Sequence, residues 1–334
     1  MFAKKIAIDL GTANSLVYVS GRGIVLREPT VVAVSVDDER VMAVGNEARD
    51  MLGKTPENIV ATKPLKDGVI ADYVVTEALL RYFINKVMGR YRFVKPELMV
   101  SIPAGATSVE SRAVLEASYS AGAKQAYLMP EPLAAAIGAG LPIGEASGNM
   151  IVNIGGGTTE IAIVSLYGMV VHGSLRVAGN TLDDAIATHI RRKYGLVIGD
   201  TTAEKVKIDI GSASSFSKER YLEVKGRDAV SGFPKTINVG SAEIIDCLTL
   251  PINQIALAIK NVLEKTPPEL SSDIIDKGII LSGGTALLSN LDKYISEYTG
   301  VAVHVADDPL LCVVKGLSKA LDNLDTLSRS MIRR

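Results

Sequence analysis

The sequence has few of the residues that build disulfide frameworks or zinc sites. It contains two cysteines, Cys247 and Cys312, among 334 residues. That number is too small for a disulfide framework and is typical of a protein from a reducing compartment. The cysteines form no CxxC pair and the three histidines are scattered along the chain, so we expect no zinc site.

The chain also lacks an excess of charge of either sign. Its 36 Lys and Arg residues against 37 Asp and Glu residues give a net charge of −1, with a pI near 6.4. A general nucleic-acid binder normally carries a clustered basic excess, so we expect no nucleic-acid partner.

Long apolar runs are missing as well. No window approaches the roughly eighteen uninterrupted apolar residues of a membrane-spanning helix. The first residues, MFAKKIAIDLGTAN, do not have the pattern of a signal peptide. We therefore expect a cytoplasmic protein, although attachment to a membrane surface needs only a few exposed apolar groups.

What the sequence does have is enough apolar material for a large core. Hydrophobic residues make up 47% of the chain and charged residues 22%, which excludes a disordered protein. The length exceeds that of one ordinary core and indicates two domains or one large divided domain.

One arrangement of strands occurs twice. KKIAIDLG reads as a buried strand, and SLVYVSGRGIVLRE reads as a hairpin that turns at Gly21–Gly23. Far downstream, Asn149–Ile154 reads as a strand, followed by the glycine turn Gly155–Gly157 and a second hairpin, TEIAIVSLYGMVVHGSL. Chance similarity of two hairpins is the alternative. We favour a duplicated two-lobed α/β fold, because hydroxyl and amide side chains occupy corresponding places in both glycine turns.

Helices are expected between these units. Helical spacing or start signals place them at 75–87, 107–121, 132–138, 181–194, from 201 onward, 250–265 and 286–298. Thr107, Thr181 and Thr201 are each followed three residues later by an acid, as in a capping box. Between Gly211 and Gly240 the sequence is polar and strand-like, which indicates a small peripheral insertion.

Three strands end in glycine turns, and these turns are the candidate ligand-binding segments. They are Asp9–Asn14 (DLGTAN), Asn153–Glu160 (NIGGGTTE) and Leu281–Ala286 (LSGGTA). Glycines after a strand let backbone N–H groups approach an anion, and neighbouring Thr and Asn side chains add donors for phosphate oxygens. Any one of them alone would be an ordinary turn, but the three together favour a nucleotide site. The Walker and dinucleotide-binding patterns are absent.

With these motifs the chain resembles the superfamily of actins, sugar kinases and heat-shock chaperone ATPases, and within it the MreB family of bacterial actins. The resemblance runs nearly end to end and rests on the three turns and on PLKDGVIADY, YFINK, EPLAAAIG, TAEKVK and EKTPPELSSDII. It implies an actin-like duplicated two-lobed fold, each lobe with a large and a small subdomain, around a cleft for ATP and Mg²⁺. The first lobe would span 1–145 with a small subdomain at about 33–65. The second would span 146–334 with a small subdomain at about 182–245, and about 315–334 would return to the first lobe.

The resemblance also implies roles for individual residues. Glu131 would orient the attacking water, with Thr158 and Asp9 as further catalytic residues. Mg²⁺ would be held through water by Asp9 and Asn153. The nucleotide would be bound by Gly11, Thr12, Ala13, Asn14, Gly155, Gly156, Gly157, Thr158, Glu204, Lys205, Val206, Lys207, Gly283, Gly284, Thr285 and Ala286. From the residues alone, Glu131 could equally be a first-turn acid of a helix, and Glu204 and Lys207 could be solvated helix charges.

Three positions depart from the family pattern, namely Asn153, Pro130 and Thr285. Asn153 stands where MreB proteins and actins usually carry an acid that supports the water shell of Mg²⁺. An amide keeps the shape but loses the charge, so we expect slow ATP hydrolysis. A filament-forming ATPase is favoured, and a nucleotide-binding scaffold without turnover or a metabolite kinase of the same fold are the alternatives. A heat-shock ATPase would need a further peptide-binding domain.

The family resemblance further implies partners. These are the chain itself, as paired protofilaments, an anionic membrane surface at the inner face of the cytoplasmic membrane, and membrane proteins of the cell-wall elongation machinery. In GRYRFVKP, the apolar side chains of Tyr91, Phe93 and Val94 lie among basic ones, a pattern that suits shallow insertion into a membrane. Core packing ahead of the strand 98–102 is the alternative for Phe93 and Val94.

Overall fold

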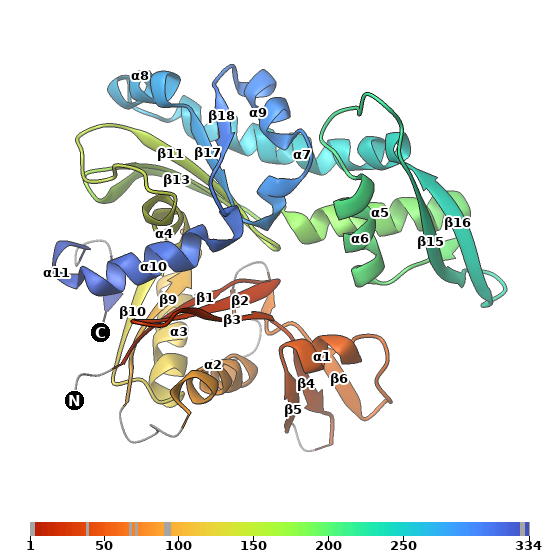
Figure 1. Ribbon diagram of the computed structural model, residues 1–334, viewed down its shortest axis with the longest axis horizontal. Coiled ribbons are helices and arrows are strands. Elements are labelled where there is room, and N and C mark those ends of the chain that lie inside the picture. Colours follow the sequence, from red (N-terminus) through yellow and green to blue (C-terminus); the bar gives the residue numbers. More distant parts are fainter. Residues whose placement is uncertain are drawn as a thin grey trace.

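The chain folds into two lobes, each built on one mixed sheet (Figure 1). The computed structural model describes residues 4–37, 40–66, 69–70, 73–89, 95–327 and 331–333. The sheet of the first lobe has the order β19-β10-β9-β1-β2-β3. Its strands are β1 (Lys5–Leu10), β2 (Asn14–Val19), β3 (Gly23–Pro29), β9 (Glu97–Ile102), β10 (Gln125–Pro130) and β19 (Ile332–Arg333).

The second lobe repeats this plan. Its sheet has the order β13-β12-β11-β17-β18, with β11 (Asn149–Ile154), β12 (Thr159–Ser165), β13 (Gly168–Leu175), β17 (Ile279–Ser282) and β18 (Val303–Val305). In both lobes the first strand pairs antiparallel with its hairpin on one side and parallel with a later strand on the other. The expected duplication is therefore confirmed by the strand order.

Each lobe also carries a small peripheral sheet (Figure 1). In the first lobe it contains β4 (Val32–Ser35), β5 (Val41–Val44) and β6 (Ile59–Thr62), next to α1 (Asn46–Met51). In the second it contains β14 (Leu196–Val197), β15 (Tyr221–Asp228) and β16 (Pro234–Gly240). Strands β7 (Leu65–Lys66) and β8 (Val69–Ile70) form a separate pair. The strand-like insertion expected between Gly211 and Gly240 is the β15–β16 hairpin.

Helices cover the sheets and connect the lobes. They are α2 (Tyr73–Met88), α3 (Ser108–Ser120), α4 (Glu131–Gly138), α5 (Gly179–Tyr194), α6 (Asp200–Ile210), α7 (Ser241–Glu264), α8 (Pro268–Lys277), α9 (Leu291–Thr299), α10 (Cys312–Asp322) and α11 (Leu324–Leu327), with short 3₁₀ helices η1 (Gly284–Leu287) and η2 (Pro309–Leu311). Between the lobes α10 packs against α4 so closely that a Cβ at Gly138 would lie 1.7 Å from the carbonyl oxygen of Cys312. A shared apolar core, including Met99, Leu133, Ile151 and Leu317, joins the two sheets there.

Several helices begin earlier than the sequence predicts, among them α5, α6 and α7. α5 begins at Gly179, and the hydroxyl of Thr181 accepts a bond from the N–H of Ala178 instead of capping the helix as its first residue. α6 begins at Asp200, one residue before the expected Thr201. α7 begins at Ser241 and continues through Pro251, whereas the sequence predicts a start at Leu250. The last predicted helix is divided into η1 and α9.

Helix α7 is the one helix among the described residues that is long and apolar enough to cross a membrane by composition. Its apolar side chains Ile244, Leu248, Ile252, Ile255 and Ile259 are fully or almost fully buried in the core of the second lobe. We therefore assign it as a core helix, consistent with the expectation of no spanning segment.

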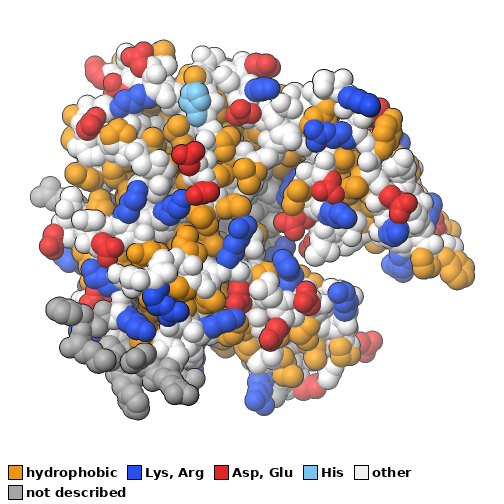
Figure 2. Space-filling model, viewed as in Figure 1, with side chains coloured by type: hydrophobic (Ala, Val, Ile, Leu, Met, Phe, Trp, Pro, Cys, Tyr) orange, Lys and Arg blue, Asp and Glu red, His pale blue; other side chains and the backbone are white. Residues whose placement is uncertain are grey.

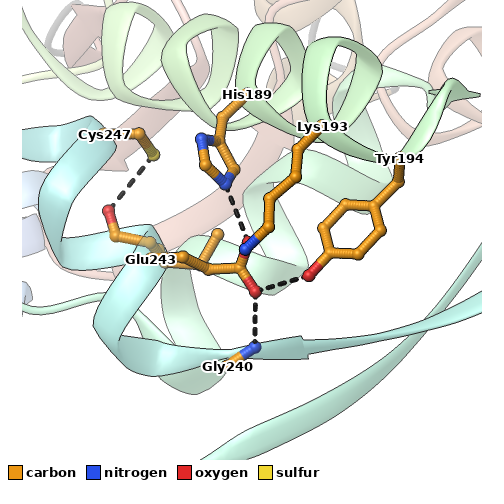
Figure 3. Close-up of polar contacts among 7 residues, drawn as sticks. His189, Lys193, Tyr194, Gly240, Glu243 and Cys247 are labelled. Atoms are coloured by element: carbon orange, nitrogen blue, oxygen red, sulfur yellow. Dashed lines mark hydrogen bonds and ion pairs between the residues drawn. The ribbon is translucent and has the colours of Figure 1, made fainter.

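The start of α7 is fixed to α5 by one carboxylate (Figure 3). Glu243 accepts hydrogen bonds from four donors, which are His189, Lys193, Tyr194 and the N–H of Gly240. Burial alone would raise the pKa of Glu243, but these bonds outweigh it and lower the pKa to about 2. The ionised carboxylate thereby anchors the β15–β16 hairpin, which ends at Gly240, to the rest of the lobe.

Candidate functional site

A cavity of about 360 Å³ lies where the two lobes face each other. The space-filling view shows the molecule hollowed between the small sheets of the two lobes, at the mouth of this region (Figure 2). Most of the residues singled out by sequence line it: Asp9, Gly11, Thr12, Ala13, Asn14, Glu131, Asn153, Gly155, Gly156, Gly157, Thr158, Glu204, Lys207, Gly283, Gly284 and Thr285. Residues up to 276 positions apart in sequence are thus brought to one site by the duplicated topology.

The two glycine turns that follow β1 and β11 touch across the cavity. A Cβ built on Gly156 would lie 2.6 Å from the Cβ of Ala13, and one built on Gly157 would lie 2.7 Å from the Oγ1 of Thr12. Glycine is therefore required because the opposite lobe leaves no room for a side chain. Residues of both turns line the same space, and turns of this kind supply the backbone N–H donors of phosphate sites.

Hydrogen bonds from elsewhere in the fold hold both turns in place. In the first lobe, the hydroxyl of Thr30 donates to the carbonyl of Gly11 (2.6 Å), and its N–H donates to the carbonyl of Ala13 (3.0 Å). In the second lobe, the hydroxyl of Thr285 donates to the carbonyl of Gly155 (2.8 Å). The turns are thus preorganised by their own lobes.

Asp9 stands at the end of β1 and faces the cavity. Its Oδ1 accepts a hydrogen bond from Ser101 on the neighbouring strand β9 (2.9 Å). Burial raises the pKa of Asp9 to about 6, because the one bond from Ser101 compensates only part of the lost hydration. No Lys or Arg within the described part of the chain forms an ion pair with this carboxylate.

Glu131 is the first residue of α4 and is buried beside Asn153. The side chain of Ser282 donates to Oδ1 of Asn153 (3.1 Å), and Nδ2 of Asn153 donates to Oε2 of Glu131 (3.4 Å). Burial raises the pKa of Glu131 well above its usual value, and the nearby charges of Asp9 and Glu160 raise it further. A buried acid with a strongly raised pKa is typical of a functional site.

Helix α6 presents one face to the cavity and another to the core. Glu204 and Lys207 line the cavity, as their spacing of three residues predicts. Lys205 is exposed to solvent and Val206 is fully buried in the core of the second lobe, so neither lines the cavity. Ala286 in η1 is likewise packed into that core. Because successive residues of α6 are rotated by about 100°, the side chains of Lys205 and Val206 point away from the face that lines the cavity.

Sequence reasoning missed several lining residues, above all Asp183 and the pair Gly179-Asn180. Nζ of Lys207 donates to Oδ2 of Asp183 (2.9 Å) and to the carbonyl of Gly179 (3.0 Å). Burial raises the pKa of Asp183 to about 6, although Lys207 opposes the shift. Gly179-Asn180 opens α5 four residues after the end of β13, and a glycine placed so soon after a strand is a signal that could have identified it.

The donor set fits Mg²⁺ better than a metal with an all-protein cage. The carboxylate and amide oxygens at this end of the cavity belong to Asp9, Glu131 and Asn153. Among the described residues, no group of three or more His, Cys, Asp or Glu side chains could hold a metal ion alone. Mg²⁺ is usually bound by one or two carboxylates together with waters and substrate phosphates. Asp9 lies beside two turns of the phosphate-binding type, and this arrangement agrees with such a site.

The basic apolar segment proposed for membrane contact cannot be placed. Tyr91, Phe93 and Val94 lie outside the described residues, between α2 and β9.

The chain is similar to known proteins over nearly its whole length. The family described as "MreB/Mbl protein" matches residues 3–329. Cell shape-determining protein MreB of Escherichia coli (strain K12) is 49% identical over 97% of this chain and 95% of its own. Cell shape-determining protein Mbl of Bacillus subtilis (strain 168) is 50% identical over 98% of this chain and 99% of its own.

Solved structures give the same result. Spiroplasma citri MreB5 bound to ADP superposes with a TM-score of 0.92 at 38% identity, over 96% of this chain and 97% of that chain. The same protein bound to AMPPNP gives 0.93 at 38% identity, over 98% and 99%. The actin-like two-lobed fold expected from the sequence is thereby confirmed.

Proposed function

Because this chain belongs to the MreB/Mbl family of cell shape-determining actin homologues, we propose that it binds ATP with Mg²⁺ between its lobes and polymerises. The observation that supports nucleotide binding is the contact between two glycine turns from opposite lobes. Asp9 lines the same cavity and forms no ion pair with the Lys and Arg residues that the structure describes. The S. citri relative, solved with ADP and with AMPPNP, supports the proposal. Calorimetry with ATP at millimolar Mg²⁺ tests the proposal, and no binding would reject it.

We assign the roles within the cavity by position. The turns Gly11–Asn14 and Gly155–Thr158 bind phosphate oxygens, while Glu204 and Lys207 hold the ribose and adenine side. Gly283–Thr285 lies under the adenosine. Asp9 and Asn153 hold Mg²⁺ through water, and the bound ion would neutralise phosphate charge. Glu131 orients the attacking water. Such sites act mainly by positioning and electrostatic stabilisation.

The proposal includes a division of the chain into two lobes, each with a small subdomain. Residues 1–145 form the first lobe, with a small subdomain at about 33–65, and residues 146–334 form the second, with a small subdomain at about 182–245. Pairing of β19 with β10 supports the return of the C-terminal segment to the first lobe. A metabolite kinase of the same fold is disfavoured by the family assignment, whereas a scaffold without turnover remains the alternative.

We propose that ATP hydrolysis is slow and that Asn153→Asp raises its rate by about 10-fold. Substitutions of residues that surround a metal site commonly change activity by about this factor. The carboxylate would supply the missing charge on the second lobe, although it gives up the donor to Glu131. Phosphate release by both proteins under polymerising conditions is the measurement. Asn180→Asp adds the same charge elsewhere in the cavity and serves as the control. Equal rates for parent and Asn153→Asp would show that Asn153 does not limit turnover.

Polymerisation is proposed to be head-to-tail, in paired protofilaments, through the small subdomains. A contact between unlike surfaces produces an open filament. At the turn of the β15–β16 hairpin, Val230 is 95% exposed and Phe233 is 72% exposed. Two such apolar side chains at the tip of a projecting hairpin mark an interaction surface (Figure 1).

The double variant Val230→Ser/Phe233→Ser is expected to raise the critical concentration for polymerisation by about 30-fold, because each of the two apolar side chains contributes on the order of 1 kcal/mol at a contact. Sedimentation with ATP and Mg²⁺ measures it. Leu250→Ser, which removes an equally exposed side chain from α7, is the control. A double variant that sediments like the parent would remove the hairpin from the contact.

The cellular setting proposed is the cytoplasm, at the inner face of the cytoplasmic membrane. There the filament would organise cell-wall synthesis together with membrane proteins of the elongation machinery. Anionic lipid would be contacted through Tyr91, Phe93 and Val94, and repetition along a filament would strengthen a weak single contact. Co-sedimentation of the parent and Phe93→Ala/Val94→Ala with anionic liposomes tests this, since equal binding would exclude the loop as anchor.

A further inference from the structure

Glu160 is a buried carboxylate at the point where the two lobes meet. It lies in β12, opposite Asn153 of β11 and Ser174 of β13, and its exposed fraction is 0%. Its side chain is not part of the cavity lining. A carboxylate buried this deeply is costly unless several donors compensate it, so its partners indicate what it does.

The donors to Glu160 come from both lobes. Oε2 accepts from the backbone N–H of Ala104 (3.1 Å), which follows β9 in the first lobe. Oε1 accepts from the hydroxyl of Ser174 (2.6 Å) in the second lobe. Thr158, which lines the cavity, precedes Glu160 by two residues, directly ahead of β12, so the position of Glu160 bears on the phosphate-binding turn.

The lobes are closely packed around this carboxylate. A Cβ built on Gly105 would lie 3.3 Å from the Cβ of Ser174, so β13 and the loop after β9 are near contact distance. A relative rotation of the lobes that separates these segments also removes the N–H of Ala104 from Glu160. Breaking that bond would leave a buried carboxylate short of one donor, which makes the closed arrangement favourable.

We propose that Glu160 is a positioning residue that couples closure of the lobes to ATP hydrolysis. One oxygen holds the first lobe through Ala104, and Glu160 lies at the start of β12, two residues after Thr158 of the phosphate-binding turn. Closure of the lobes therefore fixes the strand that carries this turn. This inference rests on the proposed ATPase function and adds the element that links its two lobes.

The proposal predicts a separation between binding and turnover. Glu160→Met keeps the size of the side chain and removes every acceptor. We expect the turnover number to fall by about 10-fold or more, since small errors in positioning are costly in rate, while the Kd for ATP changes by no more than about 2-fold. Glu160→Gln keeps an acceptor oxygen for Ala104 and should restore most of the rate.

Ser174→Ala is the matched control, because it removes a donor to Glu160 that lies in the second lobe and leaves the bond to Ala104. A residue that merely stabilises the fold would lower turnover in Glu160→Met and Ser174→Ala alike, and would weaken ATP binding in parallel. Equal losses in the two variants, or full activity of Glu160→Met, would overturn the proposal.

Amide hydrogen exchange at Ala104 gives a readout that needs no turnover. With AMPPNP and Mg²⁺ as the probe, exchange at this amide should slow in the parent and should stay fast in Glu160→Met. No slowing in the parent that binds AMPPNP would reject the coupling even if the methionine variant fails to fold. If the parent binds no nucleotide, the proposed function fails, and faster exchange in Glu160→Met than in the parent without nucleotide still decides whether the bond joins the lobes.

Discussion

Replacing Glu131 with glutamine is expected to lower phosphate release by about 10²- to 10⁴-fold, the usual contribution of a positioned acid or base. The side chain is buried at the start of α4 and faces the cavity between the two glycine turns. Glutamine keeps the shape but cannot accept a proton from water. ATP binding should remain, because the phosphate contacts come from other residues.

The same substitution should make the nucleotide-free protein more stable, by about 1 kcal/mol at neutral pH. Burial and the charges of Asp9 and Glu160 raise the pKa of Glu131 above the value of 4.5 expected in the unfolded chain. The folded state therefore binds the proton more tightly, and the parent loses stability as pH rises from about 4.5 through the folded pKa. The advantage of Glu131→Gln should thus be larger at pH 8 than at pH 5.

Two measurements check this prediction, phosphate release with saturating ATP and urea unfolding without nucleotide at both pH values. Glu116→Gln removes a solvent-exposed carboxylate from α3 and should change neither. A Glu131→Gln protein that hydrolyses ATP at the parent rate would show that another group orients the water. One that is less stable than the parent at pH 8 would show that the carboxylate is better compensated than its contacts indicate.

Replacing Gly156 with valine is expected to weaken ATP binding and hydrolysis by about 10²-fold or more, because a displacement of the order of 1 Å at a reacting site has that effect. Even a single Cβ at this position would lie 2.6 Å from the Cβ of Ala13 in the other lobe. The backbone of Gly156 is not in the left-handed region, so the effect arises from the clash between lobes. The turns can accommodate valine only by moving apart.

Calorimetry with ATP and sedimentation of filaments measure the effect of Gly156→Val. Gly168→Ala is the control, since a Cβ there would have only an ordinary contact, 3.7 Å from the carbonyl of Ser165. Unchanged affinity in Gly156→Val would mean that the two turns do not need to touch when ATP is bound.

The sequence alone determined the fold class and most of the cavity. Repetition of strand, glycine turn and hairpin identified the two lobes, because this pattern is local and each unit can be read within about twenty residues. The same locality identified Asp9–Asn14 and Gly155–Thr158 as phosphate-type turns. Motif resemblance then added Glu131 and the face of α6, and both line the cavity.

Helix starts and burial needed the tertiary structure. The sequence predicts a helix from Leu250, yet α7 begins nine residues earlier, at Ser241, because its apolar face packs into the second lobe. Lys205 and Val206 belong to the same motif as Glu204 and Lys207, but the orientation of α6 against the core turns one to solvent and buries the other. Packing of a helix against its sheet decides such orientations, and no short sequence window contains it.

Contacts between residues far apart in the sequence were decided by the tertiary structure alone. Asp183 meets Lys207, and Glu160 meets the N–H of Ala104, across sequence separations of 24 and 56 residues. Local periodicity carries no information about partners so distant in sequence. The identity of Glu160 was visible in the motif NIGGGTTE, but its position between the lobes follows from the pairing of β11, β12 and β13 and from the interlobe core that brings the end of β9 against them.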